Sequence, residues 1–187
     1  FALYDRNRET LFMARDRLGV KPIYYAVLPH STLQFGSELK SLLAHGGLAR
    51  AIDRCAIEEY FALGYVAEPR TVFAGARKLP PAHTLTIRRG EPVREPVCYW
   101  DPRFTLDRVL TPEEAVAELT ARLDESVKLR LISEVPLGAF LSGGVDSSLV
   151  VGLAAEASSR PVRTFSIGFG EPQYDELEHA RLVASHF

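Results

Sequence analysis

Short apolar runs separated by turn-forming residues dominate the first third of the chain, and this pattern predicts β-structure. Two runs flank the polar residues 6–8, and two more flank a turn around Pro29, so we expect β-hairpins over residues 1–16 and 21–37. A further strand is expected over residues 84–87, before a glycine turn at Gly90.

Two helices are expected between these strands, and each has a start signal and a stop signal. Ser37 is the predicted N-cap of a short helix over residues 37–45, and the pair Gly46-Gly47 ends it. A second helix is expected to begin at Asp53 and to end at Gly64.

A third helix has a more complete start signal. Thr111 suits the N-cap, Pro112 suits the first helical position, and Glu114 completes a capping box. Apolar residues recur at helical spacing on one face, which favours packing against a core over a groove for a partner. These residues are Val116, Leu119, Leu123 and Val127.

The pattern of elements changes near residue 100. Prolines interrupt residues 96–112, and strands then alternate with helices, which is typical of a parallel sheet. The expected elements are strand 137–141, helix 145–157, strand 162–169 and helix 174–187. We therefore predict an α/β protein with two domains, residues 1–100 and 113–187, joined by a linker over residues 101–112.

Composition narrows the class of protein without identifying it. The 187 residues are 47% hydrophobic and 25% charged, with a net charge of −2, so neither disorder nor bulk attraction to nucleic acid is favoured. Cys55 and Cys98 form no CxxC motif, and no apolar run reaches the length of a membrane span, so a cytoplasmic protein without a membrane partner is expected. The chain begins in a predicted strand and ends in a predicted helix, so we expect an internal piece of a longer protein.

The loop between the strand 137–141 and the helix 145–157 has the chemistry of a phosphate site. Gly143 and Gly144 let backbone N–H groups approach a ligand, and the following helix N-terminus favours an anion. Hydroxyls at Ser142, Ser147 and Ser148 add donors, while the carboxylate of Asp146 suggests a bridging Mg²⁺. The plainer alternative is a Gly-Gly turn in which these side chains only cap the helix.

Residues 141–148, LSGGVDSS, resemble the pyrophosphate loop of ATP pyrophosphatases, and the flanking segments indicate one branch of that family. The segments RDRLGVKPIYY, FGSELKSLL, KLPPAHTL and TFSIGF occur in the order found in glutamine-hydrolysing asparagine synthetases. The resemblance implies the end of an N-terminal-nucleophile αββα glutaminase domain, then the start of a Rossmann-like ATP pyrophosphatase domain. GMP and NAD synthetases fit poorly, because they lack this upstream partner.

By this resemblance, the loop residues hold the pyrophosphate of ATP, and Asp146 binds Mg²⁺. The loop residues are Ser142, Gly143, Gly144, Asp146, Ser147 and Ser148. The main chains of Leu141 and Ile167 are expected to contact adenosine; the alternative for both is strand core. The implied enzyme is a ligase that adenylates aspartate and amidates it with ammonia from glutamine, and a homodimer is implied by resemblance alone.

Three questions remain open: the role of one group of charged residues, the identity of the acceptor, and whether the protein is an enzyme. Arg15, Asp16 and Lys21 match a family motif, and we favour a structural role for them over a catalytic one. No catalytic residue is assigned, because the nucleophilic cysteine is expected upstream and the acceptor pocket downstream. The acceptor could therefore be another carboxylate, as in relatives associated with exosortase or exopolysaccharide clusters, or the protein could be a non-catalytic nucleotide-binding homologue.

Overall fold

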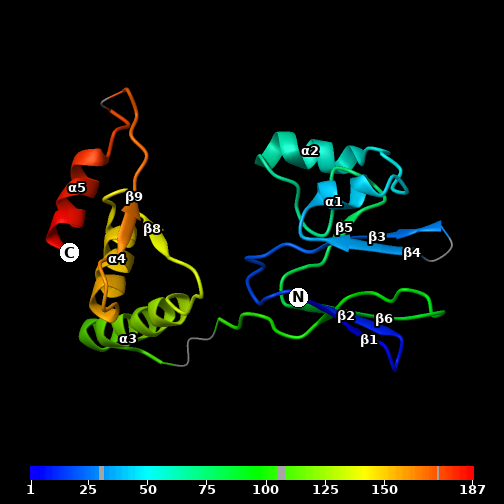
Figure 1. The fold of residues 1–187 in the computed structure, drawn as a ribbon, viewed down its shortest axis with the longest axis horizontal. Coiled ribbons are helices and arrows are strands. Elements are labelled where there is room, and N and C mark those ends of the chain that lie inside the picture. Colours follow the sequence, from blue (N-terminus) through cyan, green and yellow to red (C-terminus); the bar gives the residue numbers. More distant parts are fainter. Residues whose placement is uncertain (30–31, 105–107, 172) are drawn as a thin grey trace. The chain divides into compact units, whose positions relative to one another are not determined.

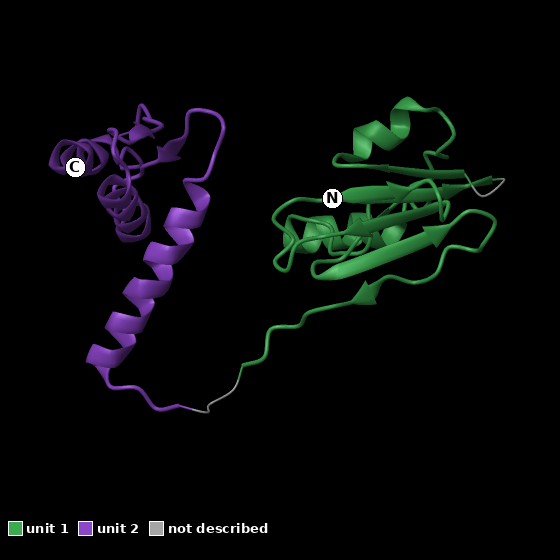
Figure 2. Cartoon of the chain, turned by 60° about the horizontal axis from the view of Figure 1, so that its bottom comes forward, with its two compact units in different colours: residues 1–105 green, residues 106–187 purple. Residues whose placement is uncertain are grey.

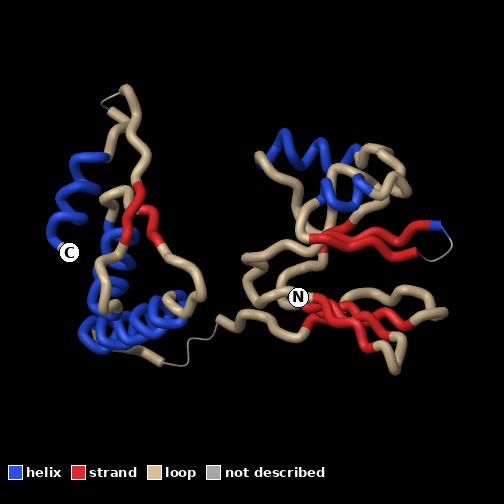
Figure 3. Tube along the Cα trace, viewed as in Figure 1, coloured by secondary structure: helices blue, strands red, loops and turns tan. Residues whose placement is uncertain are grey.

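Two units make up the chain in the computed structural model, which describes residues 1–29, 32–104, 108–171 and 173–187. The units span residues 1–105 and 106–187 (Figure 2). Both contain helices and strands, so the predicted mixed α/β class is confirmed (Figure 3). Across the described ranges, no helix is both long enough and apolar enough to cross a membrane.

Two antiparallel sheets form the first unit (Figure 1). One sheet has the order β1 (Ala2–Asp5), β2 (Thr10–Ala14), β6 (His83–Arg88) and β7 (Val97–Cys98). The other has the order β4 (Thr32–Gly36), β3 (Tyr24–Leu28) and β5 (Arg77–Lys78). Both predicted hairpins are confirmed, as β1–β2 and β3–β4. Residues 30 and 31 of the predicted second turn lie outside the described residues.

Alternating side chains of the two sheets build the core between them. Met13 of β2 and Leu85 of β6 are opposite each other in the register, and they pack with Tyr25 of β3 in one buried cluster. Neighbouring residues of a strand point to opposite faces, so Ala26 and the other face of β3 pack against Leu42 of α1 (Leu39–Ala44). The order of layers is therefore helix, sheet, sheet (Figure 1).

Helix ends in this unit follow the expected signals with one exception. α2 (Arg54–Leu63) has Asp53 as its N-cap, whose carboxylate accepts from two backbone N–H groups, and Gly64 ends it at φ 80°. The prediction of Ser37 as the N-cap of the preceding helix was wrong. That position is taken by Glu38, which is extended at φ −136° and makes no side-chain cap, because the chain leaves β4 at Gly36 and bends once more.

The second unit contains the predicted alternation of helices and strands. Its elements are α3 (Pro112–Arg130), β8 (Gly138–Phe140), α4 (Val145–Ala157), β9 (Arg163–Phe165) and α5 (Leu177–His186). Thr111 and Glu114 form the predicted capping box at the start of α3. β8 and β9 are parallel, as expected, but the predicted strand over residues 162–169 was too long, since β9 ends at Phe165.

Two small cores hold this unit together. Val127 of α3 packs against Leu153 and Ala154 of α4. Ala180 of α5 packs against Leu141, which follows β8, and these residues are buried together with Val151 of α4. The predicted apolar face of α3 is buried only near its C-terminal end: Val127 is buried, whereas Val116 and Leu119 are exposed.

Candidate nucleotide-binding site

The glycine-serine loop lies where β8 ends and α4 begins (Figure 1). Gly144 is the N-cap of α4, with extended backbone at φ −68° and ψ 162°. Because β8 and β9 are parallel, their carboxyl ends lie at the same side of the pair, and residues 141–144 and 166–168 meet there. This arrangement gives the loop the position at which open α/β sheets bind ligands.

Hydroxyl groups fix the shape of the loop. Ser147 Oγ donates to the carbonyl oxygen of Gly144 at 3.1 Å and lies 3.1 Å from Ser142 Oγ. Ser142 Oγ in turn accepts from the Gly144 N–H at 3.3 Å. Ser142 and Ser147 therefore lie together and fix the backbone of the loop at Gly144.

Gly143 is the point where α5 contacts the loop. Its φ of +87° lies in the left-handed region, which favours glycine. A Cβ on Gly143 would lie 2.5 Å from His179 Cβ and 2.7 Å from the Ala180 backbone nitrogen. The contact with α5 was not visible in the sequence, because these residues are more than thirty positions apart.

The side chains of Asp146 and Ser148 complete the predicted set. Asp146 is exposed in the first turn of α4, and its carboxylate makes no ion pair with any residue that the structure describes. Ser148 Oγ is buried without a hydrogen-bond partner among the same residues. No group of three or more acidic, histidine or cysteine side chains gathers within these ranges.

The predicted adenosine contacts lie at the ends of the two strands. Leu141 is buried, whereas Ile167 is 70% exposed. The Leu141 N–H donates to the carbonyl oxygen of Phe165 at 2.9 Å, and the Leu141 carbonyl accepts from Ser166 Oγ at 2.6 Å. Ser166 was missed by sequence analysis, since a serine in a predicted strand carries no signal of its own.

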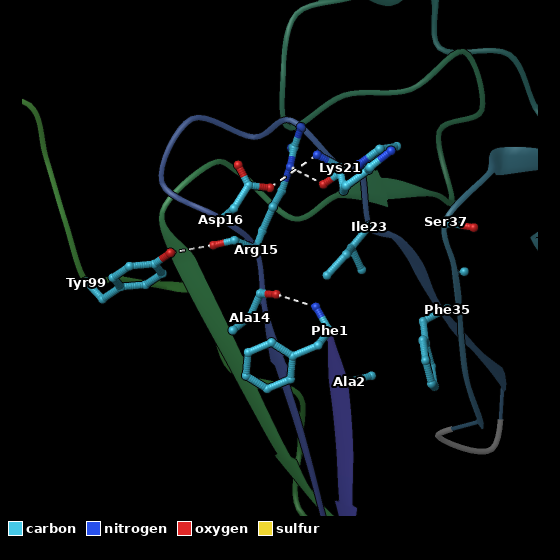
Figure 4. A pocket seen from close by; sticks show the side chains of 12 residues that line it. Phe1, Ala2, Ala14, Arg15, Asp16, Lys21, Ile23, Phe35, Ser37 and Tyr99 are labelled. Carbon is cyan, nitrogen blue, oxygen red and sulfur yellow. Dashed lines mark hydrogen bonds between the residues drawn. The ribbon is translucent and has the colours of Figure 1, made fainter. Parts of the chain in front are cut away.

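A cavity of about 640 Å³ opens in the first unit, beside the N-terminal end of β1 and the C-terminal ends of β2 and β4 (Figure 4). Its walls include Phe1, Ile23 and Phe35, and its polar residues include Arg15 and Lys21. The cavity is therefore mostly apolar, with charged groups at one side.

Arg15 is a structural residue at this cavity. Its side chain is 5% exposed, and its guanidinium donates to the carbonyl oxygens of Leu79, Gly19 and Lys21 at 2.6, 2.8 and 3.1 Å. Glu68 Oε1 lies 2.8 Å from Nη1 and balances the charge. All three nitrogens of the guanidinium have a partner, so the structural role that we favoured for Arg15 agrees with the geometry.

Asp16 shapes the loop after β2. Its carboxylate accepts from the backbone N–H groups of Val20 and Lys21 at 2.8 and 3.1 Å. These two hydrogen bonds, the first above all, lower the pKa of Asp16 below its ordinary value. Asp16 therefore also has a structural role.

Cys55 and Cys98 are free and exposed, and they lie in different parts of the first unit, Cys55 in α2 and Cys98 in β7. Neither lines the cavity.

Comparison with known proteins defines the class of each unit. Residues 1–100 match the family model described as glutamine amidotransferase domain, and residues 118–187 match the one described as asparagine synthase. A glutaminase-type domain thus precedes a synthase-type domain. The chain belongs to the glutamine-hydrolysing asparagine synthetase family.

Three relatives illustrate the range of that family. The putative asparagine synthetase [glutamine-hydrolyzing] 2 of Methanocaldococcus jannaschii is 36% identical over 191 residues, covering 100% of this chain and 36% of the relative. Asparagine synthetase [glutamine-hydrolyzing] 3 of Bacillus subtilis is 37% identical over 177 residues, covering 91% and 28%. Amidase chyE of Penicillium rubens is 38% identical over 202 residues, covering 99% and 29%. The chain thus spans about a third of the length of these relatives.

Proposed function

We propose that the protein is a glutamine-dependent asparagine synthetase, and that residues 141–148 bind the pyrophosphate of ATP. The observation that carries the proposal is the loop itself. Its glycines and hydroxyls lie at the carboxyl end of a parallel strand and at the N-terminus of α4, where backbone N–H groups and the helix dipole favour an anion.

The proposed reaction has two halves. Glutamine is hydrolysed to glutamate and ammonia in the first domain, by a nucleophile outside this chain. In the second, an oxygen of the aspartate side chain attacks the α-phosphorus of ATP, the bond to the β-phosphate breaks, and pyrophosphate leaves. Ammonia then attacks the activated carbonyl carbon, which releases AMP and forms asparagine.

The residues of this chain would bind and orient the leaving group. Backbone N–H groups at Gly143 and Gly144, with hydroxyls of Ser142 and Ser147, would face the pyrophosphate, and catalysis here depends mainly on positioning and charge. Asp146 would hold Mg²⁺, which neutralises phosphate charge when bound. Leu141 and Ile167 would contact the adenosine, and Ser148 would border the phosphates.

We also assign the two domains by their proposed folds. Residues 1–100 would be the C-terminal part of an N-terminal-nucleophile glutaminase, which is supported by two stacked antiparallel sheets with a helix outside them. Residues 101–112 would be the linker, and 113–187 the start of a Rossmann-like domain, supported by the parallel pair β8–β9. The cavity between the ends of β2 and β4 would border the glutaminase site.

A second candidate differs only in the acceptor, which would be a carboxylate other than aspartate. It is favoured by the 38% identity to a relative named amidase, which is close to the 37% identity to a relative named asparagine synthetase. Both candidates use the same ATP chemistry, so the acceptor decides between them.

The decisive experiment measures pyrophosphate release from ATP by the full-length protein, with glutamine present and aspartate added or omitted. Release that requires aspartate, with asparagine formed in equal amount, supports the first candidate. ATP binding without any dependence on aspartate supports the second.

Asp146→Ala tests the role of the loop. We expect it to abolish pyrophosphate release and to leave glutamine hydrolysis measurable, because the glutaminase half does not use this carboxylate. Glu156→Ala, an exposed acid near the other end of α4, is the matched control and should retain pyrophosphate release. Unchanged release in Asp146→Ala would contradict the assignment of phosphate and metal to this loop.

A further inference from the structure

The parallel pair β8–β9 ends in an irregular way beside the phosphate loop. The register pairs Phe140 with Phe165, and the next hydrogen bond runs from the Leu141 N–H to the Phe165 carbonyl at 2.9 Å. In a regular parallel ladder, the Leu141 carbonyl would then accept from the Ile167 N–H. Here the Leu141 carbonyl accepts instead from Ser166 Oγ, at 2.6 Å.

The hydroxyl of Ser166 thus takes the place at the Leu141 carbonyl that the Ile167 N–H would have in a regular ladder. Among the residues that the structure describes, Ile167 N donates to no acceptor, and the residue is 70% exposed. Leu141, by contrast, is 1% exposed, so its carbonyl is satisfied inside the unit by the hydroxyl. The serine therefore ends the ladder one bond early and presents a backbone donor at the carboxyl side of the strands.

The free donor lies on the side where the phosphate loop is. Ile167 follows β9, and the loop follows β8, so a nucleotide with its phosphates at Gly143 and Gly144 would place its base near the strand ends. Gly168, the next residue, contacts α5, since a Cβ there would lie 2.5 Å from Leu177 Cδ1. The same helix contacts Gly143, so α5 packs against both the phosphate loop and the segment that follows β9.

We propose that Ser166 is a positioning residue for the adenine ring, acting through the Ile167 N–H; the inference rests on the proposed function. Adenine N1 is an acceptor that a backbone N–H can pair with, whereas guanine carries a hydrogen on N1 and would set donor against donor. Ser166 thereby contributes to the selection of ATP over GTP, although it need not touch the nucleotide.

The test compares Ser166→Ala with Ser166→Thr in the full-length protein. Alanine removes the hydroxyl, so the Leu141 carbonyl is free to take up the Ile167 N–H and the base loses its donor. Threonine keeps the hydroxyl. Ser185→Ala, at an exposed position of α5, is the control for removing a serine hydroxyl elsewhere in the unit.

For Ser166→Ala we expect KM for ATP to rise about three- to tenfold, the value of one hydrogen bond, with kcat at saturating ATP within about twofold. The ratio of kcat/KM for ATP to that for GTP should fall by a similar factor. Glutamine hydrolysis should not change. Without ATP, hydrogen exchange at the Ile167 amide should be fast in the wild type. It should be slower in Ser166→Ala, because the amide can then bond to the Leu141 carbonyl. A general loss of stability would instead make this exchange faster.

The outcomes separate this inference from the function on which it rests. A wild-type KM and ATP preference in Ser166→Ala would overturn the inference and leave the proposed function standing, and so would equal impairment of Ser166→Thr and Ser166→Ala. A wild-type protein that neither binds ATP nor releases pyrophosphate would overturn both. Ser166→Thr and Ser185→Ala with wild-type kinetics, beside an impaired Ser166→Ala, would support the inference.

Discussion

Replacing Gly143 by alanine tests how tightly α5 is fitted to the phosphate loop. The new Cβ would lie 2.5 Å from His179 Cβ and 2.7 Å from both the His179 carbonyl carbon and the Ala180 nitrogen. Two of these three atoms are backbone, so α5 itself would have to move. The neighbouring glycine provides a matched control, since a Cβ on Gly144 would meet only Ser142 Oγ, at 3.4 Å.

Two costs add at Gly143. A residue with a Cβ in the left-handed region loses about 1–2 kcal/mol, and overpacking against a fixed neighbour costs about 1–3 kcal/mol. We therefore expect Gly143→Ala to destabilise the contact of α5 by about 2–5 kcal/mol. Gly144 has φ −68°, which alanine adopts freely, so Gly144→Ala should cost less than about 1 kcal/mol.

Hydrogen exchange followed by mass spectrometry can measure this in the full-length protein, because it reports local opening free energies. Amides of α5 should exchange about thirty- to several-thousand-fold faster in Gly143→Ala, while those of β2 and β6 should not change. Gly144→Ala should leave α5 near the wild-type rate. Equal exchange of α5 in the two variants would refute the packing argument, since only Gly143 meets the helix.

Two further predictions concern the first unit. Arg15→Met should lower the stability of the first unit by about 2–4 kcal/mol and so speed exchange in β2 and β6, because the buried Leu79 carbonyl, two part-buried carbonyls and Glu68 lose their partner. Arg6→Met, at an exposed position, should change the stability by less than about 0.5 kcal/mol. The pKa of Asp16 is lowered in the folded state, so its contribution to stability is complete above its unfolded pKa of about 3.9 and is lost as pH falls through the folded pKa. The difference in urea midpoint between wild type and Asp16→Asn should therefore be constant from about pH 5 to 7 and shrink progressively below about pH 4. A difference at pH 3 as large as that at pH 6 would contradict this.

Local signals predicted most of the elements correctly. Asp53 and Gly64 bound α2, and Thr111 with Glu114 starts α3, because caps act within a few residues and are readable from the sequence. Ser37 failed as a cap because the end of β4 sets where α1 can begin, and this depends on strand pairing and not on the residue itself. The predicted strand over 162–169 was too long for a related reason. Its apolar residues continue past Phe165, but the pairing with β8 ends there, and pairing cannot be seen in the sequence.

In the candidate site, too, contacts between residues near in the chain were predictable, and contacts between distant segments were not. Ser142, Ser147 and Gly144 form a local network that the sequence indicated, because the residues are close in the chain. The contact of Gly143 with α5 and the hydrogen bond of Ser166 to Leu141 join segments that are distant in sequence, and no local pattern reports them. The roles of the loop residues with ATP and Mg²⁺ stay predictions.

The strand order of the first unit also constrains how the chain can fold while it is being synthesised. β2 pairs with β1 at once, but its other neighbour, β6, emerges only after β3, β4, α1, α2 and β5. At about 5–20 residues per second, the β1–β2 hairpin waits several seconds on the ribosome with one side unpaired. The unpaired backbone N–H and C=O groups of such a strand can form hydrogen bonds with another nascent chain. The sheet β4–β3–β5, encoded wholly between β2 and β6, can form during that interval and cover Met13 before its own sheet is complete.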